Sequence, residues 1–121
     1  MRRPDVRLAV AINRSVRRDD EWFDEPDDLP RLERALNSIA EIDDAVTAAG
    51  MLASRVTSAQ AFGEGNKRTA LLLALWILDR NGEDGHRFVP PNDRQLAGLL
   101  VKAASGVNAE AKIVELFQSR R

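Results

Sequence analysis

The strongest constraint on the fold is a run of nine consecutive apolar residues from Ala70 to Leu78. A helix at the surface of a globular protein carries polar residues on one face, whereas this run is apolar all round. The sequence therefore predicts a buried central helix over residues 66–80. Asn81 and Gly82 follow, and both residue types tolerate the left-handed conformation that ends helices. The run is too short to cross a membrane.

The other periodic segments also predict helices, and no segment alternates as a sustained strand would. Further helices are expected over residues 6–16, after Pro30, 39–58, 93–104 and 108–117. Gly50 lies inside one of them and allows close packing against another helix. Arg87-Phe88-Val89 predicts one short extended piece. The fold class is therefore an all-α bundle of about six helices around the segment 66–80.

An acidic segment from Asp19 to Pro30 interrupts the helical pattern and predicts an exposed loop. Trp22 and Phe23 stand next to each other in this loop. The two aromatic side chains either anchor the loop to the core or offer a contact for another protein.

Length and charge limit the classes of partner. A chain of 121 residues predicts a single domain over 1–121, and its 18 Lys and Arg nearly balance its 19 Asp and Glu. We therefore expect no general affinity for nucleic acid or membranes, and any anion site must be local. The absence of cysteine and of an apolar N-terminal segment favours a cytoplasmic location.

The loop before the apolar run carries an anion-binding set of residues. Gly63 and Gly65 let the chain curl so that unpaired backbone N–H groups at the helix start converge. Asn66 can cap the helix or turn its amide to a phosphate, and Arg68 offers a bidentate contact. Glu64 supplies the oxygen ligand that Mg²⁺ prefers.

Two known phosphate motifs do not fit this loop. A Walker A loop needs Gly before its Lys and Ser or Thr after it, whereas Lys67 lies between Asn66 and Arg68. A dinucleotide fingerprint needs a third glycine where Arg68 stands. A solvated Lys-Arg pair beside a helix-capping Asn would explain the same residues without any ligand.

The loop resembles the motif of the Fic/Doc (Fido) family, which runs His-x-Phe-x-Asp/Glu-Gly/Ala-Asn-Gly/Lys-Arg-Thr. The corresponding residues here are Gln60, Phe62, Glu64, Gly65, Asn66, Lys67, Arg68 and Thr69. Only the first position differs, where Gln60 replaces histidine. The resemblance implies a Fido-type helical fold, closest to Doc, the small toxin of a toxin–antitoxin pair. Residues 24–36 resemble the target-docking flap, with a short β-hairpin as an option.

The resemblance also implies a site for ATP and Mg²⁺. Glu64 is expected to hold the metal, Gly65 and Asn66 to form the anion hole with Gly63 in the same loop, and Arg68 to pair with a distal phosphate. Phe62 is expected to anchor the loop in the core. Lys67 is the Doc-like variant and favours transfer of a phosphoryl group over transfer of AMP, the acceptor being a hydroxyl of a target protein. No inhibitory helix motif is visible, so an antitoxin in trans is expected.

Gln60 stands where the family has its general base, and a glutamine side chain cannot take up a proton near neutral pH. General base catalysis typically contributes about 10²–10⁴ in rate, so we expect impaired transfer with nucleotide binding retained. His86, the single histidine, follows a helix roughly 22 Å long and is not expected to substitute. The alternative is an inactive nucleotide-binding or protein-interaction regulator. A natural degenerate member and a disarmed toxin both fit Gln60.

Overall fold

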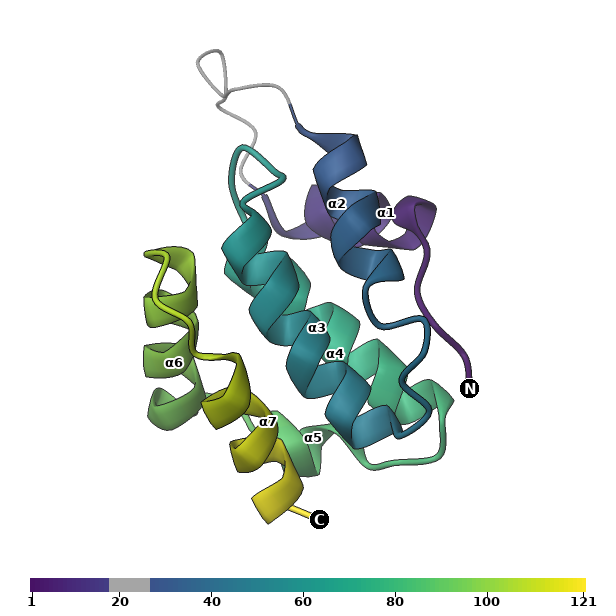
Figure 1. Ribbon diagram of the computed structural model, residues 1–121, viewed down its shortest axis with the longest axis vertical. Helices are drawn as coiled ribbons and strands as arrows, with labels where there is room; N and C mark the ends of the chain where they lie inside the picture. Colours follow the sequence, from purple (N-terminus) through teal and green to yellow (C-terminus); the bar gives the residue numbers. More distant parts are fainter. Residues whose placement is uncertain (18–26) are drawn as a thin grey trace.

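The computed structural model describes residues 1–17 and 27–121, and within them the chain forms seven α-helices and no strand (Figure 1). The helices are α1 (Val6–Val16), α2 (Leu29–Asn37), α3 (Ala45–Ala59), α4 (Asn66–Arg80), α5 (Gly85–Phe88), α6 (Arg94–Ala104) and α7 (Glu110–Ser119). The predicted all-α class is confirmed.

Aspartate side chains set the start of four helices. Asp5, Asp28, Asp44 and Asp93 precede α1, α2, α3 and α6, and each carboxylate accepts a backbone N–H from the first turn. An aspartate is a favoured residue at this position because it satisfies N–H groups that have no partner in the helix. The prediction that one helix begins at residue 39 is wrong for this reason: residues 38–41 form a turn, and Asp44 starts α3 through Thr47.

Helix α3 lies at the middle of the bundle and contacts α2, α4, α6 and α7. In Figure 1, α1 and α2 lie on one side of the α3–α4 pair and α6 and α7 on the other. Gly50 of α3 faces α7, and a Cβ atom added to it would lie 3.1 Å from the Cα of Val114. Close packing through Gly50 is therefore confirmed.

Helix α4 has the predicted bounds but is not covered on all sides. It packs against α3, α1 and α5, and it buries Leu73, Ala74, Ile77 and Leu78 among others. Leu72, in contrast, is 37% exposed, and Leu71, Leu75 and Trp76 are only partly buried. The expectation of a helix surrounded by others is therefore corrected, because the helices of the described segments leave one apolar face of α4 open.

Two local expectations are also corrected. Residues 87–89 were expected to be extended, but Arg87 and Phe88 belong to the short helix α5, whose Val89 N–H bonds to the Gly85 carbonyl. In the expected flap, residues 29–36 belong to α2, so the β-hairpin is not formed there. Trp22 and Phe23 lie outside the described residues.

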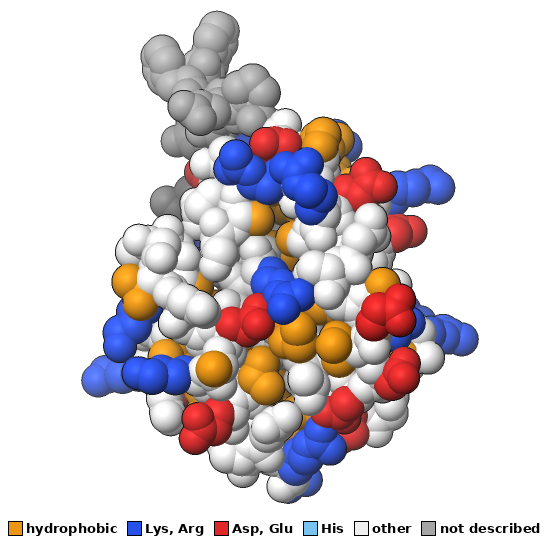
Figure 2. All heavy atoms as spheres, viewed as in Figure 1, with side chains coloured by type: hydrophobic (Ala, Val, Ile, Leu, Met, Phe, Trp, Pro, Cys, Tyr) orange, Lys and Arg blue, Asp and Glu red, His pale blue; other side chains and the backbone are white. Residues whose placement is uncertain are grey.

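The N-terminal residues are fixed to the far end of α4. The Arg2 backbone N–H donates to the Asn81 side-chain oxygen (2.7 Å), and the Asn81 amide donates back to the Arg2 carbonyl (2.9 Å). Positive and negative side chains intersperse over the face shown in Figure 2, in line with the balanced composition. Among the helices of the described segments, none has both the length and the apolar content needed to cross a bilayer.

Candidate functional site

The candidate site begins where α3 ends. Gln60 follows Ala59 in a left-handed conformation, with φ of 49°, and this residue turns the chain into the motif loop. Its side-chain Nε2 donates to the Thr57 carbonyl oxygen (2.7 Å), and its Oε1 lies 3.4 Å from the donating Nδ2 of Asn66. The amide is therefore folded back onto the end of its own helix.

Phe62 and Asn66 lock the loop to the protein interior. Phe62 is 4% exposed and Asn66 is 7% exposed. The Phe62 N–H donates to Asn66 Oδ1 (3.1 Å), and Asn66 Nδ2 donates to the Phe62 carbonyl (3.0 Å). Asn66 is the first residue of α4, and Gly65, with φ of 77°, occupies the capping position. Of the two roles expected for Asn66, helix capping is therefore wrong, because its amide closes the loop instead.

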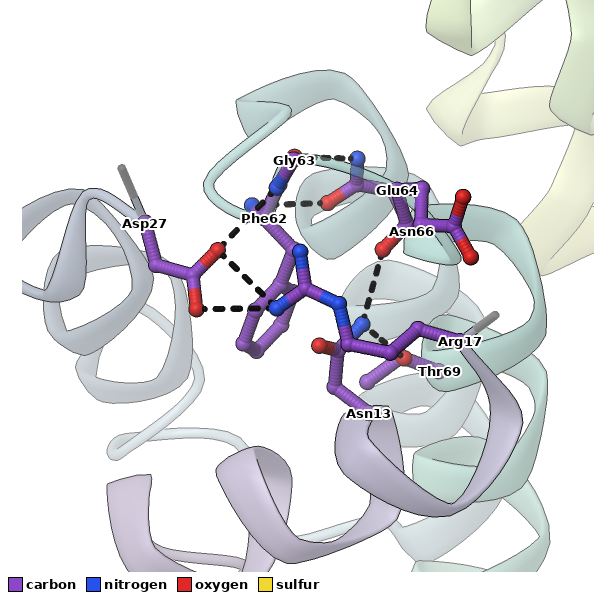
Figure 3. Close-up of polar contacts among 8 residues, drawn as sticks. All are labelled: Asn13, Arg17, Asp27, Phe62, Gly63, Glu64, Asn66 and Thr69. Carbon is purple, nitrogen blue, oxygen red and sulfur yellow. Dashed lines mark hydrogen bonds and ion pairs between the residues drawn. The ribbon is translucent and has the colours of Figure 1, made fainter. Parts of the chain in front are cut away.

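Two side chains from outside the motif hold the loop on its outer side (Figure 3). Asp27 accepts a hydrogen bond from the Gly63 N–H (3.1 Å) and pairs with Arg17 at the end of α1 (3.2 Å). The backbone adds a second contact, because the Asp28 N–H donates to the Ala61 carbonyl (2.6 Å). The Gly63 amide already has an anionic partner within the chain, so it is not available to a ligand in this arrangement.

Asn13 of α1 holds the loop on its inner side. This residue is 1% exposed, and its Nδ2 donates to the Glu64 carbonyl (2.9 Å) and to Thr69 Oγ1 (3.2 Å). Figure 3 shows Asn13 beneath the loop, between Glu64 and Thr69. The motif loop is thus fixed from α1, from the start of α2 and from its own Asn66.

A hollow of about 320 Å³ opens at the start of α4. It is lined by Val16 and by the five motif residues Glu64, Gly65, Asn66, Lys67 and Arg68. No side chain caps this helix, and the Gly65 and Asn66 N–H groups find no acceptor within residues 1–17 and 27–121. Lys67 and Arg68 are exposed and make no ion pair with the described residues. The hollow combines free amides with two cations and suits an anion.

A larger groove of about 790 Å³ continues from this hollow along the open face of α4. Val16 and Arg68 line both cavities, and Leu71, Leu72 and Leu75 form the floor of the groove. His86 and the Pro90-Pro91 pair also line it. His86 therefore shares a groove with Arg68, which the sequence did not lead us to expect, but Gln60 lines neither cavity.

The hollow offers one carboxylate, that of Glu64, to the expected metal ion. The described residues contain no group of three or more His, Cys, Asp or Glu side chains that could hold a metal ion. Mg²⁺ in nucleotide sites is commonly held by one or two carboxylates, by water and by the phosphates themselves. Glu64 lines the hollow next to the free amides, so the donor set fits a magnesium ion that arrives with a nucleotide.

Three residues of the site were missed by the sequence analysis: Asn13, Arg17 and Asp27. Asn13 had a visible signal, because a lone amide falls among the apolar positions of the first helix. Asp27 had no such signal, because it lies in an acidic stretch where any carboxylate looks equivalent.

Comparison with known proteins supplies one match. The model of the Fic/DOC family matches residues 6–78, which include α1, α2, α3, the motif loop and nearly all of α4. No curated protein resembles the chain closely enough to count as a match.

Proposed function

The chain belongs to the Fic/DOC family, and from this premise we propose that it binds ATP with Mg²⁺ in the hollow at the start of α4. The transferred group would be a phosphoryl group or AMP, and the acceptor would be a hydroxyl of another protein. ATP with Mg²⁺ is the usual donor in this family.

One observation carries the proposal: free amides and two exposed cations surround a single hollow. The partial positive charge at the helix start and the charges of Lys67 and Arg68 act on the same volume. A solvated Lys-Arg pair alone would not need a glycine cap or a loop fixed from three sides. Glu64 would hold the metal ion, which would neutralise phosphate charge.

We further propose that transfer is impaired in this chain. Gln60 cannot act as a base, and its amide is hydrogen-bonded to Thr57 and Asn66 rather than directed into the hollow. His86 lines the larger groove together with Arg68, whereas Gln60 lines neither the groove nor the hollow. Without a base the acceptor hydroxyl keeps its proton, which makes it a poor nucleophile.

Lys67 favours the Doc type and therefore phosphoryl transfer over AMP transfer. On this proposal the protein is the toxin member of a toxin–antitoxin pair in the cytoplasm, and its antitoxin is a separate chain.

The second candidate is an inactive regulator that binds nucleotide and acts through protein contacts. The orientation of Gln60 favours this candidate, because its side chain supports the loop without facing a reactant. The two candidates share the nucleotide site and differ in whether a restored base restores transfer.

Nucleotide binding is tested by calorimetry of the folded protein with Mg-ATP. We expect measurable binding by the unaltered chain and a loss of about tenfold or more in Arg68→Ala, because a charged contact to phosphate is removed. Arg34→Ala is the matched control, since Arg34 is also exposed and makes no ion pair with the described residues but lies on α2. Absence of binding by the unaltered chain would remove the proposal.

Transfer is tested with Gln60→His and ATP labelled at the γ- or α-phosphate. Label on a protein substrate, together with growth arrest in cells, supports the transferase. If nucleotide binds but neither effect appears, the regulator is favoured. The position of the label separates phosphoryl transfer from AMP transfer.

A further inference from the structure

Asn13 is a candidate for positioning the anion-binding loop, although it lies on α1 and outside the motif. Its Nδ2 donates to the Glu64 carbonyl at 2.9 Å, and that carbonyl belongs to the peptide unit that joins Glu64 to Gly65. The fixed direction of one carbonyl determines the plane of the whole peptide unit, because the C–N bond does not rotate freely.

The described residues contain no cis peptide bond, so the Glu64–Gly65 unit is trans. In a trans unit the carbonyl and the following N–H point in opposite directions. Since the Glu64 carbonyl points inward to the buried Asn13, the Gly65 N–H points away from Asn13, and Gly65 itself lines the hollow. That N–H has no acceptor among the described residues.

We propose that Asn13 is a positioning residue for the proposed nucleotide site: it holds the Glu64–Gly65 peptide so that the Gly65 N–H donates to a phosphate oxygen. The inference rests on the proposed function and names a residue that the family motif does not contain. Asn13 does not line the hollow, so it acts through the groups that it holds and not by contact with the ligand.

Packing alone does not account for an asparagine at this position. Asn13 is 1% exposed, and its Oδ1 has no hydrogen-bond partner among the described residues. A buried acceptor without a partner lowers stability, so an apolar side chain of similar size would remove that cost. What an apolar side chain would not provide is the donor for the Glu64 carbonyl.

The shape of the loop also depends on this contact. A Cβ atom at Gly65 would lie 3.1 Å from Asn13 Nδ2 and 3.4 Å from Val16 Cγ2, so only glycine lets the loop approach α1 this closely. The left-handed φ of Gly65 gives the same preference. Asn13 and Gly65 are therefore matched to each other.

The test compares Asn13→Leu with the unaltered chain, with Mg-ATP and inorganic pyrophosphate as separate probes. Leucine keeps the volume and removes the donor. We expect the dissociation constant for both probes to rise about tenfold. Asn81→Leu is the matched control, because the Asn81 amide also donates two hydrogen bonds, to the carbonyls of Arg2 and Ile77, at the opposite end of α4. We expect it to lose stability without losing affinity.

A second measurement on the unaltered chain does not depend on any variant folding. In amide NMR spectra we expect the Gly65 N–H resonance to shift on titration with pyrophosphate, as a new hydrogen bond would cause. Unchanged affinity of folded Asn13→Leu, or anion binding with no shift at Gly65, would overturn the inference and leave the proposed function intact. No binding by the unaltered chain would overturn both.

Discussion

Gln60 has a left-handed backbone and a side chain that supports the loop, and substitution can separate the effects of these two properties. The backbone there is left-handed, with φ of 49°, which costs an L-residue roughly 1–2 kcal/mol. The side chain supports the loop through Thr57 and Asn66. The resemblance of the motif predicts Gln60 as the substituted base position, but the sequence could not show the strained backbone, because that conformation results from the reversal of the chain between α3 and α4.

We predict that Gln60→Gly stabilises the protein by about 0.5–1 kcal/mol, because glycine adopts this conformation freely. Loss of the partly buried hydrogen bond to Thr57 offsets part of the gain. Urea unfolding measures the difference. Gly82→Ala is the opposite control: Gly82 has φ of 88°, and no atom of the described residues lies within 4 Å of an added Cβ, so alanine should cost about 1 kcal/mol through the backbone alone. A destabilised Gln60→Gly would show that the side-chain contacts outweigh the strain.

At the same scale, the motif residues were found from their order along the chain, and their neighbours were not. Glu64, Asn66 and Arg68 stand within five positions of one another, so their proximity needed no knowledge of the fold. Asn13 and Asp27 reach the loop only because α1 and the start of α2 pack beside it. Contacts between residues about 36–51 positions apart depend on the tertiary structure, which periodicity does not give.

Among the helices, apolar periodicity predicted the type of every element except the short α5, and it predicted the ends of the helices less accurately. α4 has the predicted bounds because glycine before it and the Asn81-Gly82 pair after it are strong end signals. α3 begins six residues later than expected, because apolar residues such as Ile42 continue the pattern into the turn before the Asp44 cap. The open face of α4 was not foreseen, since an apolar run does not tell which face a neighbour covers.

Substitution of two helical glycines, Gly50 and Gly98, tests how tightly neighbouring helices pack. We predict that Gly50→Ala lowers the free energy of unfolding by about 1–3 kcal/mol, because the new methyl group meets the α7 backbone at Val114. Gly98→Ala in α6 is the matched control: within residues 1–17 and 27–121 nothing lies within 4 Å of its added Cβ, so alanine should stabilise by about 0.5–1 kcal/mol. Thermal and urea unfolding of both variants give the comparison. Equal effects of the two changes would contradict close packing at Gly50.

Over the whole molecule, the last two residues of the chain connect the end of α7 to the starts of two other helices. Arg120 pairs with Asp93, the cap of α6 (2.6 Å), and donates to the Phe88 carbonyl (2.7 Å). Arg121 pairs with Asp44, the cap of α3. Burial raises the pKa of the Asp93 carboxyl, but hydrogen bonds from Arg120, Leu96 and Gln95 and the charge of Arg120 outweigh it and hold the pKa below 3.8.

This arrangement predicts that the free energy of unfolding depends on pH in the acid range. A carboxyl with a lowered pKa stabilises the folded state above the pKa of the unfolded chain, and the contribution is lost as pH falls through the folded-state pKa. Arg120→Ala should therefore cost about 2–3 kcal/mol at neutral pH and progressively less below pH 3.8. Arg121→Ala should cost less than about 1 kcal/mol, because its pair with Asp44 is nearly half exposed. Urea unfolding at several pH values checks both, and a pH-independent cost for Arg120→Ala would contradict the role of the charge.

The reciprocal pairing of Arg2 with Asn81 has a practical consequence for binding experiments. It fixes the first residues beside the end of α4 that is remote from the motif loop. Helix α4 separates this end from the loop, and its 15 residues span about 22 Å. A fluorophore or an affinity tag joined to Met1 therefore starts on the opposite side of the molecule from the hollow. Protein immobilised through such a tag on a sensor surface should keep the entrance to the hollow open to the solution.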